Sequence, residues 1–415
     1  HSDYSLLDSC TQFADYIEFA KQNGMTAIAS TEHGLTRGWI EKKVLCDEAG
    51  IKFIHGVEMY LTEDLTHPVR DNYHTILLAK NMDGVRELNS LVSLSSHDDH
   101  FYYTNRLSFD EFLGISDNII KTSACLAGPL NKLDDSNPYF IRLLKHYDYL
   151  EVQPHLAEEQ KAYNKKLLEL SKQYGIPLIA GTDTHSLNTY KAECRTILTI
   201  AKHKHYDDDG FDLTAKTYDE LVELFRQQGV LPEEAYLQAI ENTNRVAEQC
   251  ENWALDKKTK YPILYGSAEA DEEKFRQVVW EGLEDKLQRG VIPREREAAF
   301  RASLSEELDV FHRLGMSGFM LSMSELIRWC KEHDIAVGPA RGSVGGSRCA
   351  YVSDIIDLDP EQWHTVFSRF CNVNRKETGD IDVDVTAEDR PRIFEYIIQR
   401  FGTEKTARVA SYGTL

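Results

Sequence analysis

Short apolar runs alternate with polar segments of helical period over the first 190 or so residues. The apolar runs predict strands, and segments such as Gln12–Gln22 and Glu158–Tyr174 predict helices between them. The expected strands are Thr26–Ser30, Lys52–Val57, Thr75–Ala79, Asn118–Thr122, Tyr147–Val152 and Ile176–Ala180. Such repetition favours parallel strands in an α/β barrel or layered sheet, with functional residues at the carboxyl ends of the strands.

The second half of the chain has a different pattern. Residues 216–262 are charged and helix-rich, and a new unit begins near Ser267. Helical spacing of apolar residues predicts further helices, and short apolar runs predict two strands around a glycine-rich loop. The expected helices are Ala268–Arg289, Ser303–Leu314, Met323–Lys331 and one from about Ser347; the strands are Ile335–Val337 and the run Asp380–Asp384.

Composition narrows the class of protein. The length of 415 residues allows two or three domains. A net charge of −21 excludes a uniformly basic surface but leaves room for a local basic groove. Eight cysteines without CxxC pairs, no long apolar run and no signal-peptide pattern predict a cytoplasmic protein.

Residues of metal-ligand type recur near the ends of the N-terminal strands. Imidazole nitrogens together with carboxylates suit Zn²⁺, Mn²⁺ or Fe²⁺. Any one of these residues alone would more often be a helix cap or a core residue, but the set predicts a metal site. Its members are His1, Asp8, His33, Glu58, His74, Cys125, Asp183 and His185.

A second constellation lies near the C-terminal end. Asp382 and Asp384 alternate with apolar residues, so on a strand both carboxylates would project from one face and two Mg²⁺ ions would offset their repulsion. The alternative is an exposed edge strand. The preceding loop is suited to a phosphate, or is simply a flexible turn with a helix cap. Its candidate phosphate-binding residues are Arg341, Gly342, Ser343, Gly346 and Ser347.

Four motifs in this order resemble the palm of bacterial C-family replicative DNA polymerases, the DNA polymerase III α subunits. They are Val337–Ser347, Asp357-Leu358-Asp359-Pro360, Phe367-Ser368-Arg369-Phe370 and Asp380–Asp384. The resemblance implies that Asp382 and Asp384 are two of three catalytic aspartates, the third lying beyond Leu415. It also implies that the loop 341–347 binds the dNTP triphosphate, with Arg369 and Arg375 as basic support. Gly379, Val385, Ala340 and Val344 depart from the commonest family residues.

The N-terminal segments resemble the polymerase and histidinol phosphatase (PHP) domain that precedes this palm. They are His1–Asp8, Thr31-Glu32-His33-Gly34, Gly56-Val57-Glu58, Tyr73-His74, Ser123–Gly128 and Asp183-Thr184-His185. The resemblance implies a metal cluster that hydrolyses phosphoesters, a 3′→5′ proofreading exonuclease in polymerases. His1 matches the second histidine of an HxH motif. Glu32 replaces a common aspartate, which puts its supporting role in doubt.

Three other histidines lie outside these motifs. His155 is either a substrate contact or a surface histidine, whereas His97 and His100 are expected to be solvated in a polar loop.

The combined prediction is a distorted (β/α) PHP barrel followed by a polymerase-β-like nucleotidyltransferase palm, a mixed sheet with helices. Residues 1–262 would form the PHP domain and residues 263–415 an incomplete palm. The function expected of the longer protein is primer extension with dNTPs, using Mg²⁺ in the palm and Zn²⁺ or Mn²⁺ in the PHP site. Expected partners are primer–template DNA and, through regions outside this sequence, a sliding clamp and other replisome subunits; no membrane is expected. The alternatives are a small-molecule phosphoesterase such as histidinol phosphatase, and an inactive PHP scaffold.

Overall fold

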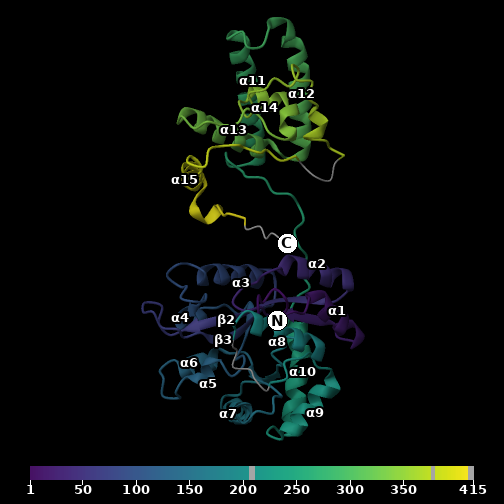
Figure 1. The fold of residues 1–415 in the computed structure, drawn as a ribbon, viewed down its shortest axis with the longest axis vertical. Coiled ribbons are helices and arrows are strands. Elements are labelled where there is room, and N and C mark those ends of the chain that lie inside the picture. The colour runs from purple at the N-terminus through teal and green to yellow at the C-terminus, as the bar shows by residue number, and fades with distance from the viewer. Residues whose placement is uncertain (205–210, 375–378, 410–415) are drawn as a thin grey trace. The chain divides into compact units, whose positions relative to one another are not determined.

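The computed structural model describes residues 1–204, 211–374 and 379–409 (Figure 1). The chain forms two compact units, His1–Asp256 and Lys257–Leu415. Between the last helix of the first unit and the first helix of the second, residues 250–267 contain no helix or strand. None of the described helices has the length and apolar character needed to span a membrane.

The first unit is built on two sheets. One has the strand order β1 (Ala27–Ser30), β2 (Lys52–Thr62), β3 (Tyr73–Ala79), β5 (Ile119–Thr122), with β4 (Leu107–Ser108) also pairing with β2. The other consists of β6 (Leu150–Val152) and β7 (Leu178–Ala180). A parallel bridge between Thr122 and Tyr149 connects the two sheets, so the strands follow one another around the unit.

All six predicted strands of this unit are present, but the expectation that they are all parallel is wrong. β1 and β2 are parallel, as are β6 and β7, whereas β3 is antiparallel to both β2 and β5. The physical reason is the short link after β2, since only ten residues separate Thr62 from Tyr73, too few for a helical crossover. The result is a mixed α/β domain, as the fold class predicted.

Helices surround these sheets. The β2 side chains Val57, Met59 and Leu61 are fully buried in the main core, and Asn242 of α10 donates a 2.6 Å hydrogen bond to the carbonyl of Leu178 in β7. The helices of this unit are α1 (Phe13–Gln22), α2 (Trp39–Ala49), α3 (Met82–Ser95), α4 (Phe109–Leu113), α5 (Pro129–Lys132), α6 (Phe140–His146), α7 (Glu158–Tyr174), α8 (Thr189–Ala201), α9 (Tyr218–Gln228) and α10 (Glu233–Gln249).

The second unit is mainly helical in its described residues. Phe275, Phe300 and Phe311 are completely buried and form its core together with Met320. Its helices are α11 (Ala268–Gln288), α12 (Glu297–Leu314), α13 (Ser317–Glu332), α14 (Arg348–Val352) and α15 (Arg390–Phe401), with short 3₁₀ turns η1 (Arg294–Arg296), η2 (Ser343–Gly346), η3 (Phe367–Arg369) and η4 (Thr403–Lys405).

The two strands predicted in this unit are not regular strands. Val337 and Val385 form a single antiparallel bridge, and the amide of Gly338 donates a 2.8 Å hydrogen bond to the carbonyl of Asp384. Neither segment has another strand beside it among the described residues, and an isolated pair of this kind lacks the ladder that makes a strand. The Asp380–Asp384 run therefore lies extended along the glycine-rich loop.

Candidate metal centre and nucleotide site

All eight predicted ligands of the first unit lie in one connected cluster. His33 follows β1, Glu58 lies in β2, His74 lies in β3 and Cys125 follows β5. Asp183 and His185 follow β7, while His1 and Asp8 belong to the segment that precedes α1. The eight ligand-type residues therefore come from at least five separate segments of the chain, which the sheets of this unit bring together.

Glu58 is the central residue of this cluster. Its Oε1 lies 3.0 Å from Nδ1 of His33 and 3.0 Å from Nδ1 of His74, and its Oε2 lies 3.2 Å from Nε2 of His1. The sulfur of Cys125 is 3.5 Å from Nδ1 of His74. One buried carboxylate thus joins three histidines.

Asp8 and Asp183 complete the other side. Oδ2 of Asp8 lies 2.5 Å from Nε2 of His33 and 3.3 Å from Nε2 of His185. Oδ1 of Asp183 lies 3.4 Å from Nε2 of His1. The backbone of Asp183 has a φ of +48°, a left-handed conformation that is uncommon for a residue with a side chain. Such conformations are concentrated at functional sites, where the surrounding contacts maintain them.

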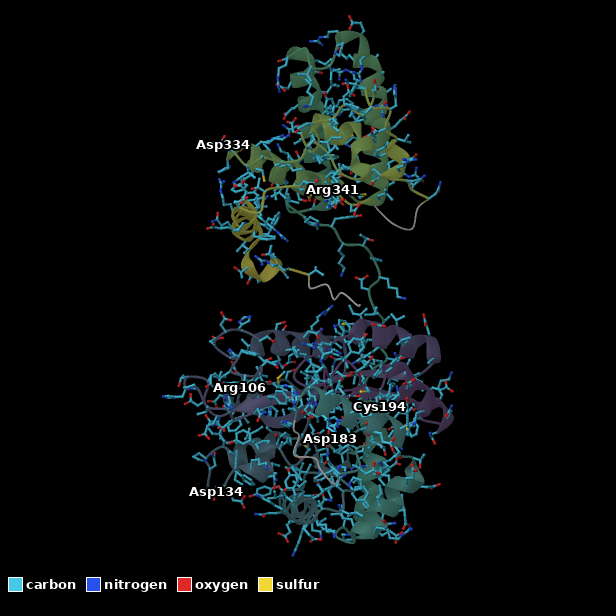
Figure 2. The ribbon with its side chains drawn as sticks, viewed as in Figure 1. Arg106, Asp134, Asp183, Cys194, Asp334 and Arg341 are labelled. Carbon is cyan, nitrogen blue, oxygen red and sulfur yellow. The ribbon has the colours of Figure 1, made fainter. Side chains whose placement is uncertain are left out.

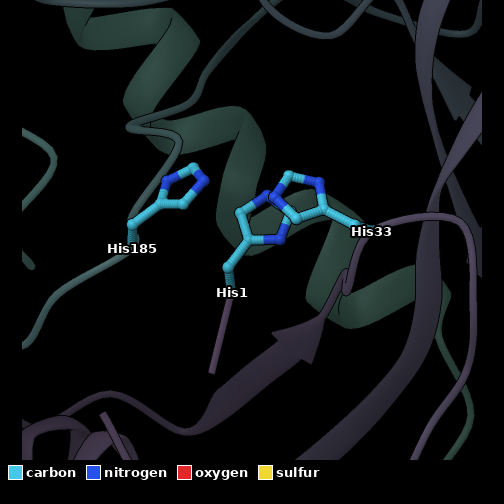
Figure 3. A group of neighbouring side chains, drawn as sticks. All are labelled: His1, His33 and His185. Carbon is cyan, nitrogen blue, oxygen red and sulfur yellow. The ribbon is translucent and has the colours of Figure 1, made fainter. Parts of the chain in front are cut away.

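The rings of His1 and His33 stack with centroids 3.9 Å apart, and His185 lies beside them (Figure 3). Within two groups of three residues, all ligand atoms lie within 4.8 Å of one another; the groups are His1, His33, His185 and His1, Glu58, Asp183. The two groups overlap at His1, so they mark adjoining parts of one site.

The electrostatics of the cluster also fit a cation. Burial and the nearby His1 lower the pKa of His33, but Glu58 and Asp8 outweigh them and raise it to about 9. Burial raises the pKa of Glu58, but the surrounding histidines outweigh it and hold the value well below the usual range. The buried carboxylates thus favour positive charge beside them, which a divalent cation would supply.

Two residues outside the predicted ligand set hold this cluster in place. Arg195 of α8 contacts Oδ1 of Asp8 through Nε at 3.0 Å and also contacts the Asp8 carbonyl at 2.7 Å. Glu32 accepts hydrogen bonds from the Ser2 amide (3.0 Å), the Ser2 and Ser5 hydroxyls (2.5 Å each) and Lys42 (2.5 Å). Glu32 therefore has a supporting role although it replaces the common aspartate. Its side chain, which is longer than that of aspartate, reaches the segment that carries His1 and Asp8.

A cavity of about 730 Å³ adjoins the cluster, with His1, Glu32 and Asp183 in its lining. Glu151 lines it too and was not predicted. Burial raises the pKa of Glu151 to about 7, and its carboxylate accepts 2.9 Å hydrogen bonds from Thr122 and Gln153. Nothing in the local sequence around Glu151 signals this position, which depends on the pairing of β6 with β7.

Of the three histidines outside the motifs, one contradicts its prediction. His97 is exposed, as expected. The prediction that His100 is solvated is wrong: it is 6% exposed and lies 2.7 Å from Asp99 and 2.8 Å from Glu111. The capping box of α4 positions Glu111 for this contact. His155 is also buried and is therefore not a surface histidine.

In the second unit, Arg341 brings the two candidate aspartates together. Its Nη1 lies 2.8 Å from Oδ1 of Asp384 and its Nη2 lies 3.1 Å from Oδ1 of Asp382 (Arg341 is labelled in Figure 2). Both carboxylates are partly exposed, at 38% for Asp382 and 53% for Asp384. They are accessible oxygen ligands, of the kind that Mg²⁺ prefers, and they already attract a cation.

The residues of the glycine-rich loop differ in how exposed they are to solvent. Gly342 adopts a φ of +79° and turns the chain beside Asp382. Ser343 is partly exposed, whereas Gly346 and Ser347 are buried. The Ser347 hydroxyl donates a 2.8 Å hydrogen bond to Glu307 and accepts one from the amide of Ala350, so it starts α14. The exposed part of the loop available to a phosphate is therefore Arg341–Ser343.

One of the remaining motifs contacts this loop directly, since the amide of Asp357 donates a 2.7 Å hydrogen bond to the carbonyl of Pro339. Asp359 receives two hydrogen bonds from Arg296, at 2.7 and 3.1 Å, and Thr365 donates one to the carbonyl of Gly345. Arg369 ends η3, and Arg375 lies outside the described residues.

Comparisons with known proteins find a different family domain in each of the two units. Residues 1–172 match the PHP domain, and residues 273–415 match the bacterial DNA polymerase III alpha NTPase domain. The chain belongs to the family of bacterial DNA polymerase III alpha subunits. Three relatives, each a DNA polymerase III subunit alpha, align with 100% of it. They come from Borreliella burgdorferi (31% identity), Treponema pallidum (31%) and Aquifex aeolicus (28%).

The chain spans between 36% and 38% of the length of these relatives. Among solved structures, a complex of Endonuclease Q aligns with a TM-score of 0.33 and 16% identity, over 81% of this chain and 91% of that one. A TM-score this low leaves the family assignment to the domain matches.

Proposed function

We propose that the PHP site of this chain hydrolyses phosphodiesters, as a 3′→5′ exonuclease that removes mispaired primer ends. The contact of Glu58 with three histidines, beside Asp8 and Asp183, is the observation that carries this proposal. Zn²⁺ or Mn²⁺ bound there would supply positive charge for a phosphate and a water of lowered pKa.

The chain's own residues prepare the site for this reaction. The histidines and carboxylates are in contact before any ligand arrives, so little reorganisation is needed on binding. Arg195 orients Asp8, and Glu32 holds the segment from His1 to Asp8. Glu151 adds a carboxyl group with a pKa near neutrality in the adjoining cavity, a value suited to exchanging protons with water.

The test is trimming of a 3′-mispaired primer in the presence of Mn²⁺ or Zn²⁺. We expect Asp183→Ala/His185→Ala to lose at least about 100-fold in rate, as removal of groups that act together does. His97→Ala/Asp98→Ala is the matched control, since it removes the same residue types from an exposed loop. An absence of both trimming and bound metal in the wild-type chain would contradict the proposal and favour an inactive scaffold.

We propose further that the second unit contributes to nucleotidyl transfer in the longer protein, which would extend primer–template DNA with dNTPs. Asp382 and Asp384 would hold Mg²⁺, which neutralises developing charge in an in-line displacement. Arg341 would exchange its contacts with these carboxylates for the triphosphate, because a guanidinium binds either anion through two hydrogen bonds. A sliding clamp and other replisome subunits are proposed partners of regions outside this sequence.

Nucleotide binding tests this second proposal without requiring polymerisation. Titration of the chain with dTTP and Mg²⁺ should show binding that Arg341→Ala weakens by about tenfold, the effect of losing one charge-assisted hydrogen bond. Arg313→Ala, an exposed arginine on α12, should leave the affinity unchanged. Equal affinity of the wild type, Arg341→Ala and Arg313→Ala would show that Arg341 does not bind the triphosphate.

A further inference from the structure

His155 lies three residues beyond the end of β6, and Asp183 lies three residues beyond the end of β7. In the register of this pair, Val152 lies opposite Ala180, and the amide of Gly181 donates to the carbonyl of Val152 at 3.0 Å. The chain leaves both strands at the same edge, so the segment ending at His155 runs beside the segment leading to Asp183. Burial is the largest influence on the pKa of His155 and lowers it; the charges of Asp183 and Asp212 act to raise it, and those of Lys216 and His185 act to lower it further.

A buried network of amide side chains holds the backbone of His155. Gln228 of α9 donates to the carbonyls of His155 at 2.6 Å and Gln153 at 2.9 Å. Asn164 of α7 donates to the Gln153 carbonyl at 2.7 Å and to Gln228 at 2.7 Å, and accepts from Gln160. The three amide side chains of this network are at most 5% exposed. Two helices thus fix the position of the turn after β6.

The imidazole of His155 is buried but incompletely bonded. The residue is 6% exposed and packs edge-on against Phe211, with ring centroids 4.9 Å apart. Its Nε2 has no hydrogen-bond partner among the described residues. A buried polar atom without a partner costs free energy, and such an atom at a functional site indicates a missing partner from solvent or a ligand.

We propose that His155 contacts the substrate of the PHP site, with Nε2–H donating a hydrogen bond to a non-bridging oxygen of the phosphodiester. This inference rests on the proposed phosphodiesterase function and adds a substrate-binding residue to it. The ring is a neutral donor above about pH 5, because burial lowers the pKa of His155 to about 4. A neutral donor can bind the phosphate without competing with cations for the carboxylates.

Two variants test this contact. His155→Phe keeps an aromatic ring against Phe211 and removes the donor, whereas His155→Gln keeps an N–H donor on a flexible side chain. With Mn²⁺ and thymidine 5′-p-nitrophenyl phosphate, His155→Phe should raise KM by about tenfold or more, the effect of one lost hydrogen bond to a charged group. Its metal content and unfolding midpoint should match those of the wild type, and His155→Gln should recover part of the loss. His97→Phe, at an exposed position, should change none of these values.

Binding of thymidine 5′-monophosphate to the Mn²⁺-loaded chain separates this inference from the function on which it rests. Weaker binding by His155→Phe supports the contact even if the wild type hydrolyses no diester, a result that would overturn only the phosphodiesterase proposal. Wild-type KM and wild-type nucleotide affinity in His155→Phe would overturn the contact, as would a wild-type chain that loads Mn²⁺ and binds no nucleotide. If His155→Phe does not fold, the same comparison is made with His155→Leu, which also lacks an N–H donor and whose wild-type values would equally overturn the contact.

Discussion

Glu32 shows how much one side chain can support a site without belonging to its ligand set. Its carboxylate receives hydrogen bonds from Ser2, Ser5 and Lys42, and both Glu32 and Lys42 are almost completely buried. Burial raises the pKa of Glu32, but Lys42 and the other donors outweigh it and lower the pKa from 4.5 to about 2. The ionised form is therefore part of the folded state.

Replacing Glu32 by glutamine should destabilise the first unit by roughly 3 to 5 kcal/mol, because it leaves the Lys42 ammonium buried without a counter-charge. Urea unfolding would measure this loss. Since the folded pKa of Glu32 is depressed, its contribution is present above about pH 4.5 and is lost as the pH falls towards 2. The wild type should lose this stability over that range, and Glu32→Gln should lack the corresponding decrease.

Glu48→Gln, an exposed change of the same type on α2, is the control and should have little effect. An unfolding free energy of Glu32→Gln within about 0.5 kcal/mol of the wild type would contradict the role given to this carboxylate.

The sequence predicts the residues with the chemistry but not those that hold them. His33 and Glu58 could be selected because each follows a short apolar run in the sequence and is of ligand type, although β2 continues past Glu58 to Thr62. Arg195 could not, because its contact with Asp8 joins residues 187 positions apart and an arginine on a helix is usually solvated. Burial of His100 was likewise hidden, because it depends on a partner eleven residues away.

At the scale of elements, the start of α14 depends on one residue of α12 and one residue of the glycine-rich loop. Glu307 of α12 is 2% exposed and accepts hydrogen bonds from the amides of Arg348 (3.0 Å) and Cys349 (2.9 Å). Ser347 caps the same end of the helix from within the glycine-rich loop. The loop is therefore fastened at Ser347 and exposed at Arg341.

We expect Ser347→Ala to destabilise the second unit by about 1 to 2 kcal/mol, the usual cost of losing an N-cap. Ser343→Ala should leave the stability almost unchanged, because the partly exposed Ser343 does not cap α14. Denaturant unfolding of both variants checks this difference. Equal losses in the two variants would mean that Ser347 contributes no more to the helix start than Ser343.

A helix with a long periodic pattern was predictable to its bounds, whereas a two-residue strand was not predictable at all. The helix Glu158–Tyr174 has its predicted bounds because its apolar spacing and acidic first turn agree. β4 has two residues and carries too little pattern to be recognised. The aspartate run alternates like a strand, yet only Val385 pairs, because alternation reports the faces of an extended chain and not whether a partner exists.

For the whole molecule, we propose that the division after Asp256 separates units that fold independently. Residues 1–256 and 257–415 produced separately should each unfold cooperatively. Mn²⁺ at about 100 times its dissociation constant should stabilise the first fragment by about 2.7 kcal/mol and leave the second nearly unchanged at the same concentration. Thermal unfolding with and without EDTA measures this. Loss of cooperative unfolding in either fragment would contradict the proposed independence.

The position of Glu58 between distant parts of the chain has a consequence for the order of folding. Its histidine partners lie at positions 1, 33 and 74, and the contact of Asp8 with Arg195 closes a loop of 187 residues. Closing such loops costs entropy that is offset only once the sheet is complete, so we expect the cluster to form after the main folding barrier. A cation that binds the completed cluster would therefore retain the native state mainly by slowing unfolding, with little effect on the folding rate. The metal site would therefore increase the kinetic stability of this domain in addition to any chemical role.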